Sequence, residues 1–281
     1  MKLYSIDTGL FKLDGGAMFG VVPKSLWNKL VPADDNNLCT WAMRCLLIEE
    51  NNKLILIDTG IGNKQNEKFV SHFHLHGKDT LRSSLAKHGF NKEDITDVIL
   101  THLHFDHVGG AVERAGDKLA LTFPNATYWS NEAHWQWATK PNAREKASFL
   151  PENILPLQDS GQLKMIDENN PFFSENITIR FANGHTKSMM LPQIHYNDTT
   201  ILYMADLLPS VAHIPLPYVM GYDMFPLTTL QEKEFYLNEA VSHNYILFFE
   251  HDAVNECCTL QQTEKGIRVK DLFPLSQITG Y

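Results

Sequence analysis

The segment THLHFDHVGG, residues 101–110, places four metal-ligand side chains within one short stretch: His102, His104, Asp106 and His107. In an extended segment residues i and i+2 point to the same side, so His102 and His104 project together. The aspartate and the third histidine follow as the chain turns, and the Gly109-Gly110 pair permits that turn without a Cβ penalty. Imidazole nitrogens and carboxylate oxygens are ligands of zinc and similar ions. The segment therefore predicts a metal site rather than a merely solvated or pH-sensitive histidine patch.

Further ligands are expected downstream, because one metal needs three or four protein ligands and two metals need more, including a shared bridging group. Three candidates lie just beyond apolar runs that are typical of strands: His185 after 177–182, Asp206 after 201–204 and His251 after 245–249. His102 follows the apolar run 98–100 in the same way. Ligand-type residues at four strand ends predict one metal-binding rim.

The remaining histidines have other expected roles. Residues 71–76, SHFHLH, lack a neighbouring carboxylate and lie in a predicted helix, where residues i and i+2 do not face each other. They are interpreted as a surface or subunit-contact feature, with metal binding as the alternative. Isolated histidines in helical or strand patterns are interpreted as structural: His88, His134, His195 and His243. His213 follows Asp206 in a proline-rich loop, and we expect it to contact substrate.

Asp58 ends a strand, as the metal ligands do. Metal-bound histidines usually donate their second N–H to a carboxylate or carbonyl. Asp58 is therefore expected to orient such a histidine, to cap its own Asp-Thr-Gly turn, or both.

The elements that must position these residues alternate between strand and helix patterns. Runs at 45–50 and 53–58 flank Asn51-Asn52 and predict a hairpin. A helix is expected over 79–88, with Gly89 as a stop signal, and a capping box at Thr229–Glu232 predicts a helix to about Ser242. Strands are expected at 98–100, 177–181, 193–196, 201–204 and 245–249. This pattern predicts an α/β fold in which two sheets pack face to face with helices outside, a four-layer αββα sandwich.

The chain has 281 residues, a net charge of −9 and a pI near 5.8, and it is predicted to be one domain over 1–281 with a helical insertion at 131–160. Residues 1–42 are expected to form an irregular apolar arm that covers a domain edge or forms a homodimer contact. The acidic balance disfavours nucleic acid as a partner. No apolar run approaches a membrane span or a signal peptide, and the four cysteines form no CxxC pair, so a cytoplasmic protein with reduced thiols is expected.

The HxHxDH motif at 102–107, with His185, Asp206 and His251 downstream, resembles the metallo-β-lactamase superfamily, from about Cys45 to Asp252. That resemblance implies an αββα hydrolase with a dinuclear site of two divalent ions, zinc first, with iron or manganese as alternatives. It implies one metal on His102, His104 and His185, a second on Asp106, His107 and His251, and Asp206 as the bridge.

Differences from the family pattern indicate which branch of the family the chain resembles most. Antibiotic-cleaving members commonly use Cys or His where this chain has Asp206, so β-lactamase activity is disfavoured. Segments 14–24 and 205–223 are more similar to YtnP-like quorum-quenching lactonases and their phosphotriesterase relatives. Acyl-homoserine lactonases place a tyrosine three residues after the bridging aspartate, where this chain has Pro209. Tyr218, Tyr222 and His213 are the candidates to replace it.

The expected function is metal-dependent hydrolysis, in which a metal-bridging hydroxide opens an acyl-homoserine lactone or a related ester. Asp106 is expected to orient the nucleophile and carry its proton, and Asp206, His213 and Tyr222 are the other catalytic candidates. Apolar residues of 208–225 line a substrate pocket or belong to the core. The alternatives are a phosphotriesterase, a glyoxalase II-like thioesterase and a metal-binding scaffold without turnover. The expected partner is a small molecule with an apolar tail.

Overall fold

The protein is described by a computed structural model over residues 1–280, and the chain divides into two compact units. Unit 1 comprises Met1–Gly9 and Met43–Pro171 with the C-terminal end, and unit 2 comprises Leu10–Ala42 and Phe172–Ile278. The prediction of a single domain over 1–281 stays a prediction beside this division.

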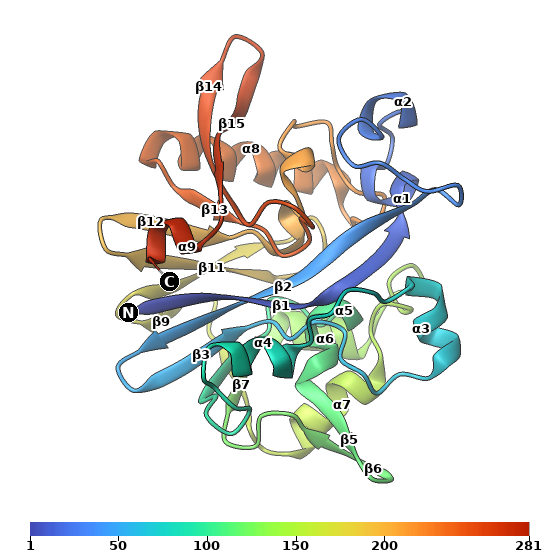
Figure 1. Ribbon diagram of the computed structural model, residues 1–281, viewed down its shortest axis with the longest axis vertical. Helices are drawn as coiled ribbons and strands as arrows, with labels where there is room; N and C mark the ends of the chain where they lie inside the picture. The colour runs from blue at the N-terminus through green and yellow to red at the C-terminus, as the bar shows by residue number, and fades with distance from the viewer. Residues whose placement is uncertain (281) are drawn as a thin grey trace. The chain divides into compact units, whose positions relative to one another are not determined.

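Unit 1 is built on a six-stranded sheet of order β1-β2-β3-β4-β7-β8, whose first two strands continue into unit 2 (Figure 1). The strands are β1 (Lys2–Asp14), β2 (Leu38–Glu50), β3 (Lys53–Ile57), β4 (Asp97–Ile99), β7 (Thr127–Asn131) and β8 (Leu163–Ile166). A separate hairpin consists of β5 (Val112–Ala115) and β6 (Lys118–Leu121). The helices are α3 (Glu67–Phe73), α4 (Leu81–Lys87), α5 (Phe105–Val108), η1 (Gly109–Ala111), α6 (Glu132–Thr139) and α7 (Pro151–Asp159).

The predicted hairpin is confirmed as β2 and β3, which pair antiparallel from Leu46↔Ile57 to Glu50↔Lys53. Its two turn residues, Asn51 and Asn52, have φ angles of 48° and 62°. Positive φ at both central positions is the type I′ turn that matches the twist of paired strands, and asparagine tolerates it. β3 then runs parallel to β4, so the residues that follow these two strands emerge at the same sheet edge.

Unit 2 is built on a seven-stranded sheet of order β15-β14-β13-β12-β11-β10-β9. The strands are β9 (Phe172–Ser174), β10 (Ile177–Ala182), β11 (Met189–Tyr196), β12 (Thr199–Tyr203), β13 (Ile246–Phe248), β14 (Cys257–Thr263) and β15 (Gly266–Phe273). The helices are α1 (Gly15–Phe19), α2 (Lys24–Trp27), η2 (Ala205–Leu207), η3 (Val211–His213) and α8 (Pro226–His243), and α9 (Ser276–Thr279) lies at its C-terminal limit. β12 and β13 are parallel, so Asp206 and His251 both follow strands that end at one edge.

The helix predicted from Thr229 begins earlier, at Pro226, where a proline occupies the first turn. The predicted capping box does not form, because the carboxylate of Glu232 instead accepts from the backbone N–H groups of Asn183 and Gly184, at 2.7 and 2.9 Å. Glu232 thus ties α8 to the two residues that precede His185. A local sequence signature was outcompeted by a contact between distant segments.

The prediction of an irregular arm over 1–42 is wrong for its first third, which is the strand β1. The backbone of β1 is paired with β2, and this pairing satisfies amide groups that the sequence pattern alone left unassigned. The aromatic side chains of the arm are buried: Phe11, Phe19, Trp27 and Trp41. Two helices, α6 and α7, lie within 131–160, and the helical insertion expected there stays a prediction.

All four cysteines are buried free thiols, as expected. Among the described residues, none of the helices is long and apolar enough to cross a membrane. The core of unit 1 gathers around the β4 strand, where Val98 and Leu100 are fully enclosed with Leu103 and Val108 beyond the strand end. This packing fixes the backbone on both sides of the histidine motif.

Candidate metal-binding site

The first group of ligand residues, here called the histidine cluster, consists of His102, His104, Asp106 and His107 in unit 1. It spans the connection from β4 into the short helix α5, and His104 is the N-cap residue of that helix. The exposed fractions of its members are between 0% and 7%. Burying four ionisable groups this closely is costly unless they are paired or bind a metal.

Hydrogen bonds fix the proton positions on the first two histidines. The hydroxyl of Thr101 lies 2.6 Å from Oδ2 of Asp58 and 3.1 Å from Nδ1 of His102. Because the hydroxyl donates to the carboxylate, Nδ1 of His102 carries the proton and Nε2 keeps its lone pair. Nε2 of His104 lies 3.0 Å from Oε1 of Glu145, so His104 keeps its lone pair on Nδ1.

These two lone-pair nitrogens, Nε2 of His102 and Nδ1 of His104, are 3.1 Å apart. Two nitrogens at 2.0–2.1 Å from a tetrahedral zinc would be separated by about 3.3–3.4 Å. The observed separation therefore fits two ligands of the same metal ion. Without an ion, two lone pairs would face each other across a hydrogen-bonding distance.

Asp58 has the orienting role that the sequence predicts. Its carboxylate is fully buried and lies 3.1 Å from Nδ1 of His107, and it also accepts from the N–H of Thr101 at 2.8 Å. His107 therefore keeps a lone pair on Nε2. Asp58 itself has a φ of 58°, a left-handed conformation that directs its side chain to these partners.

Glu145 orients His104 and was missed by sequence reasoning. It lies between α6 and α7 and is 1% exposed. Its second oxygen accepts from Nε1 of Trp137 at 2.6 Å and from Nδ2 of Asn142 at 3.3 Å. A lone glutamate 41 residues after His104 carries no spacing signal, so only the folded structure identifies it.

Gly109 and Gly110 serve a different purpose from the one predicted. Gly109 has an ordinary helical φ of −57°, so the turn itself does not require glycine. A Cβ on Gly109 would lie 2.2 Å from the carbonyl oxygen of Ile61, and one on Gly110 would lie 2.1 Å from that of Thr59. The pair is needed because the 59–61 backbone approaches this closely, and Thr59 in turn donates to the carbonyl of His107 at 2.8 Å.

The second group, here called the Asp206 cluster, consists of His185, Asp206 and His251 in unit 2. Oδ2 of Asp206 lies 3.1 Å from Nε2 of His185, and Oδ1 lies 3.0 Å from Nε2 of His251. All three side chains are at most 7% exposed. Each carboxylate oxygen thus faces a different histidine, which is the arrangement of a carboxylate that bridges two ions.

The backbone before Asp206 is strained. Ala205 has a φ of 41°, in the left-handed region that residues with a Cβ rarely adopt. Such strain costs about 1–3 kcal/mol and persists where the surroundings impose it. Here it turns the chain sharply after β12 and directs Asp206 between the two histidines.

Asp223 was also missed as a site residue, although it lies within the 205–223 segment. Its Oδ1 is 2.9 Å from Nδ1 of His185, and the side chain is 2% exposed. Burial alone would lower the pKa of His185, but the carboxylates of Asp206 and Asp223 outweigh it and raise that pKa to about 10. The two carboxylates therefore favour the protonated form of His185, and a cation bound there would have to displace that proton.

His251 is oriented by the backbone. Its Nδ1 donates to the carbonyl of Ala42 at 2.7 Å, and the N–H of Ala42 donates to the carbonyl of His251 at 3.0 Å. The ring also packs against Phe11, with centroids 5.6 Å apart. The N-terminal arm thus fixes the tautomer that leaves Nε2 of His251 with a lone pair.

His213 is placed as a structural anchor of the loop after Asp206. Its Nδ1 accepts from the hydroxyl of Ser210 at 2.8 Å, and its Nε2 donates to the carbonyl of Met18 at 2.9 Å. The ring stacks on Phe19 with centroids 4.6 Å apart, and burial lowers its pKa to about 3. Both ring nitrogens of His213 form hydrogen bonds within the protein. Its expected contact with substrate stays a prediction.

The tyrosine candidates differ in environment. Tyr222 is 38% exposed and immediately precedes Asp223. Tyr218 packs edge-on against Phe19, with centroids 6.2 Å apart. Of the apolar residues at 207–225, five are core: Leu207, Leu208, Ala212, Ile214 and Met220. Phe225 is 43% exposed, so only part of this segment is available to a substrate.

The exposed histidines at 72, 74 and 76 do not form a comparable site. α3 ends at Phe73, His74 adopts a left-handed conformation, and Nδ1 of His76 contacts the carbonyl of His74 at 2.8 Å. His134 is buried and accepts the N–H of Leu103 at 2.9 Å, a structural role next to the histidine cluster.

Comparison with known proteins identifies a common family. The profile of the Metallo-beta-lactamase superfamily matches residues 44–241. An N-acyl homoserine lactonase from Bacillus cereus is 28% identical over 165 residues, 55% of this chain and 56% of the relative. The match thus spans about half the length of that relative.

Two solved structures are similar over nearly the whole chain. A probable metal-dependent hydrolase from Staphylococcus aureus has a TM-score of 0.86 and 28% identity, covering 96% of this chain and 95% of that one. The dizinc quorum-quenching lactonase AidC has a TM-score of 0.80 and 22% identity, covering 97% and 95%. The predicted α/β fold class, a four-layer αββα sandwich, is confirmed by these likenesses.

Proposed function

The chain belongs to the metallo-β-lactamase superfamily, and from that premise we propose that it is a metal-dependent hydrolase that opens lactones. The observation that carries the proposal is the placement of Asp206, whose two oxygens face His185 and His251 separately. A carboxylate shared in this way suits two divalent ions rather than one.

We propose that the histidine cluster and the Asp206 cluster together hold those two ions. Support comes from the donor chemistry: each of the five histidines has one nitrogen fixed by a hydrogen-bond partner and the other left with a lone pair or shared with Asp206. Such outer partners are typical of metal-bound histidine. The set of His, Asp and no Cys admits zinc, iron or manganese, and the dizinc state of AidC makes zinc the first choice.

Two bound ions would supply a water nucleophile active at neutral pH and would polarise the lactone carbonyl. Asp106, in the first turn of α5 and 7% exposed, is proposed to accept the proton of that water on its carboxylate and deliver it to the departing alkoxide oxygen. Tyr222 is proposed to donate a hydrogen bond to the substrate carbonyl oxygen, in place of the tyrosine expected at position 209.

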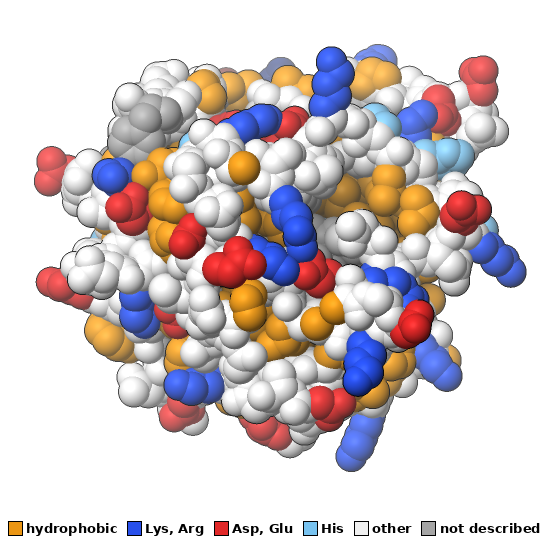
Figure 2. Space-filling model, turned by 60° about the horizontal axis from the view of Figure 1, so that its bottom comes forward, with side chains coloured by type: hydrophobic (Ala, Val, Ile, Leu, Met, Phe, Trp, Pro, Cys, Tyr) orange, Lys and Arg blue, Asp and Glu red, His pale blue; other side chains and the backbone are white. Residues whose placement is uncertain are grey.

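The proposed substrate is an uncharged lactone with an apolar tail, of the acyl-homoserine lactone type. Similarity to N-acyl homoserine lactonases supports this class. The net charge of −9 disfavours polyanions, and acidic and basic side chains are interspersed on the face shown in Figure 2. A phosphotriester, a thioester and a role without turnover remain as the competing candidates.

The experiment that tests the proposal is a hydrolysis screen of the metal-loaded protein. Acyl-homoserine lactones of increasing chain length, an aryl phosphotriester and a thioester would be compared by kcat/KM. We expect the lactones to be the best substrates, with kcat/KM rising with acyl length by up to about fourfold per methylene until the chain is fully buried. Faster turnover of the phosphotriester than of every lactone would contradict the proposal.

We also propose that the N-terminal arm forms a homodimer contact. Two of its apolar side chains are exposed, Val21 by 93% and Leu26 by 50%. Light scattering of the wild type and of Val21→Asp would test this, because a dimer that depends on the arm should dissociate in the variant. A monomeric wild type would refute it.

A further inference from the structure

An apolar cavity of about 720 Å³ lies within unit 2, and its lining does not include the side chains of the Asp206 cluster. It is lined by the arm, by the loop after Asp206, by the loop after His251 and by β15. Its apolar walls include Leu30, Val31, Trp41, Ala212, Ile214 and Val254. Small-molecule pockets typically measure roughly 300–1,000 Å³, so this volume suits one ligand. It is called the arm cavity below.

Both exposed and buried apolar side chains line the arm cavity. Leu30 is 53% exposed and Val254 is 85% exposed, and both line the cavity. Trp41 and Ile214, which also line the cavity, are 1% and 2% exposed. Apolar side chains at the rim and along the walls favour a ligand that is itself an apolar chain.

The polar groups that line the arm cavity are satisfied by hydrogen bonds within the protein, with one exception. The carboxylate of Asp252 accepts from the backbone N–H groups of Val211, Val254 and Asn255, at 3.0, 2.9 and 2.8 Å. The hydroxyl of Ser210 is bonded to His213. Buried polar groups with internal partners make little demand on a ligand.

Arg268 is the exception. Among residues 1–280 its guanidinium forms no ion pair, and its hydrogen bond is from Nη1 to the carbonyl of Ile267, at 2.6 Å. Arginine presents five N–H donors in a fork that matches a carboxylate. Arg268 therefore supplies a cation at an apolar cavity with no acidic partner of its own.

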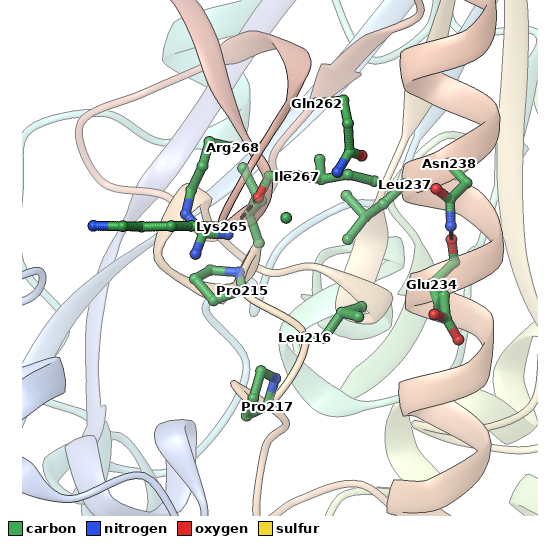
Figure 3. Close-up of a pocket in the computed structure, with 12 residues that line it drawn as sticks. Pro215, Leu216, Pro217, Glu234, Leu237, Asn238, Gln262, Lys265, Ile267 and Arg268 are labelled. Atoms are coloured by element: carbon green, nitrogen blue, oxygen red, sulfur yellow. Dashed lines mark hydrogen bonds between the residues drawn. The ribbon is translucent and has the colours of Figure 1, made fainter.

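A second cavity, of about 530 Å³, shares Arg268, Ile214 and Pro215 with the arm cavity. Figure 3 shows this neighbouring cavity, with Arg268, Lys265 and Pro215 on one side and Leu237 and Asn238 of α8 on the other. Arg268 thus lines both cavities, whereas Lys265 lines only the second one.

We propose that the arm cavity binds an unbranched aliphatic carboxylate, with its chain between the arm and the loop of Val254 and its head group on Arg268. The site is separate from the proposed reaction, because a simple carboxylate has no lactone to open. The binding proposal can therefore be tested independently of the hydrolase proposal. The neighbouring cavity, whose rim includes Glu234 and Asn238, is the less apolar alternative for the chain.

The test is calorimetric titration of the metal-loaded protein with decanoate, octanoate and decanol. Decanoate should bind saturably at one site, and octanoate, which is two methylenes shorter, about fifteenfold more weakly, since each methylene contributes about fourfold. Arg268→Gln should weaken decanoate about tenfold and leave decanol unchanged, because only the carboxylate uses the guanidinium. Lys270→Gln, an exposed cation of the same strand outside both cavities, is the matched control and should have no effect.

Two cavity-filling variants decide where the chain lies. Val269→Trp narrows the arm cavity and should abolish binding, whereas Ile267→Trp narrows only the neighbouring cavity and should not. If Val269→Trp unfolds, Val254→Asp at the exposed rim replaces it and should weaken decanoate by repulsion. No saturable binding, equal losses in Arg268→Gln and Lys270→Gln, or loss only in Ile267→Trp would each overturn the proposal.

Discussion

Oε1 of Glu145 lies 3.0 Å from Nε2 of His104, on the side of the ring remote from Nδ1. The contact leaves Nδ1 as the nitrogen that faces His102, so a residue between two helices determines which atom of a proposed ligand is available.

Replacing Glu145 should therefore weaken metal binding without removing a ligand. Glu145→Ala should lower zinc affinity about 10–100-fold, and Glu145→Gln less, because the amide oxygen can still accept from His104. Competition with a chelator would measure both. Glu132→Ala, an exposed carboxylate at the start of α6, is the control and should bind zinc as the wild type does. Equal affinities across all four proteins would show that Glu145 has no orienting role.

The protein should hold about two divalent ions per chain when metal is replete. The seven proposed ligands exceed what one tetrahedral ion can use. Elemental analysis after dialysis gives the stoichiometry, and removal of the ions should lower the unfolding temperature because binding stabilises only the folded state. A value that stays at one ion per chain would contradict the dinuclear centre, whichever metal is found.

Asp206→Asn should reduce kcat/KM far more than His213→Ala. The first change removes the charge shared between His185 and His251, so a loss beyond about 100-fold, with lower metal content, is expected. The second removes a buried ring and two hydrogen bonds, and it should lower the free energy of unfolding by about 2–4 kcal/mol while metal stays bound. Steady-state kinetics, urea unfolding and metal analysis separate these effects. An Asp206→Asn protein with both ions and normal turnover would refute the bridging role.

The sequence was most informative where a residue's type and its position at a strand end coincided. The HxHxDH motif and His185, Asp206 and His251 were recognisable because apolar strands are readable and ligands cluster at their ends. The hairpin at Asn51-Asn52 was recognisable for the same local reason.

The residue roles that the sequence did not predict depend on contacts between segments that are distant in the chain. Glu145 and Asp223 act on His104 and His185 from loops with no regular spacing to them. Glu232 was misread as a cap because its tertiary partners outcompete the local one. Gly109 and Gly110 were assigned to a turn, whereas the close approach of Thr59 and Ile61 is what excludes a side chain.

Metal binding should strengthen as the pH rises. Burial opposes protonation of His185, but Asp206 and Asp223 together raise its pKa to about 10, so the metal-free site carries a proton at neutral pH. A metal must displace it, and the apparent association constant should therefore rise by up to about tenfold per pH unit below pH 10. Zinc titrations between about pH 6 and pH 8, with proton release followed by an indicator, would measure this. Asp223→Asn should lower the pKa of His185 and flatten the slope, and an unchanged slope would contradict the assignment.

Lys233 should make the free energy of unfolding depend on pH as well. Its ammonium is fully buried and donates to the carbonyls of Pro215, Leu216 and Tyr218. Burial lowers its pKa to about 7, against the opposing charge of Asp223. Between pH 7 and about 10.4 the unfolded chain binds the additional proton, so this group makes stability rise with pH. Lys233→Met should remove that rise and cost about 3 kcal/mol through three unsatisfied carbonyls. Urea unfolding across this pH range measures both, and a variant as stable as the wild type would show that the carbonyls find other donors.

Tyr222→Phe should lower kcat for lactone hydrolysis, because Tyr222 is the tyrosine proposed to donate to the substrate carbonyl oxygen. Its ring is 38% exposed beside Asp223, whereas both nitrogens of His213 are engaged and Tyr218 packs on Phe19. Losing one such donor costs about 100-fold in sites where it acts in the transition state, so a fall of about tenfold or more is expected in kcat with KM nearly unchanged. Tyr218→Phe is the matched control and should retain activity. Neither variant replaces a metal ligand, so both should keep their ions. Elemental analysis would show that a change in kcat is not caused by loss of metal. Wild-type kcat in Tyr222→Phe with a loss in Tyr218→Phe would transfer the role to Tyr218, and no loss in either would leave the carbonyl oxygen to the metal ions alone.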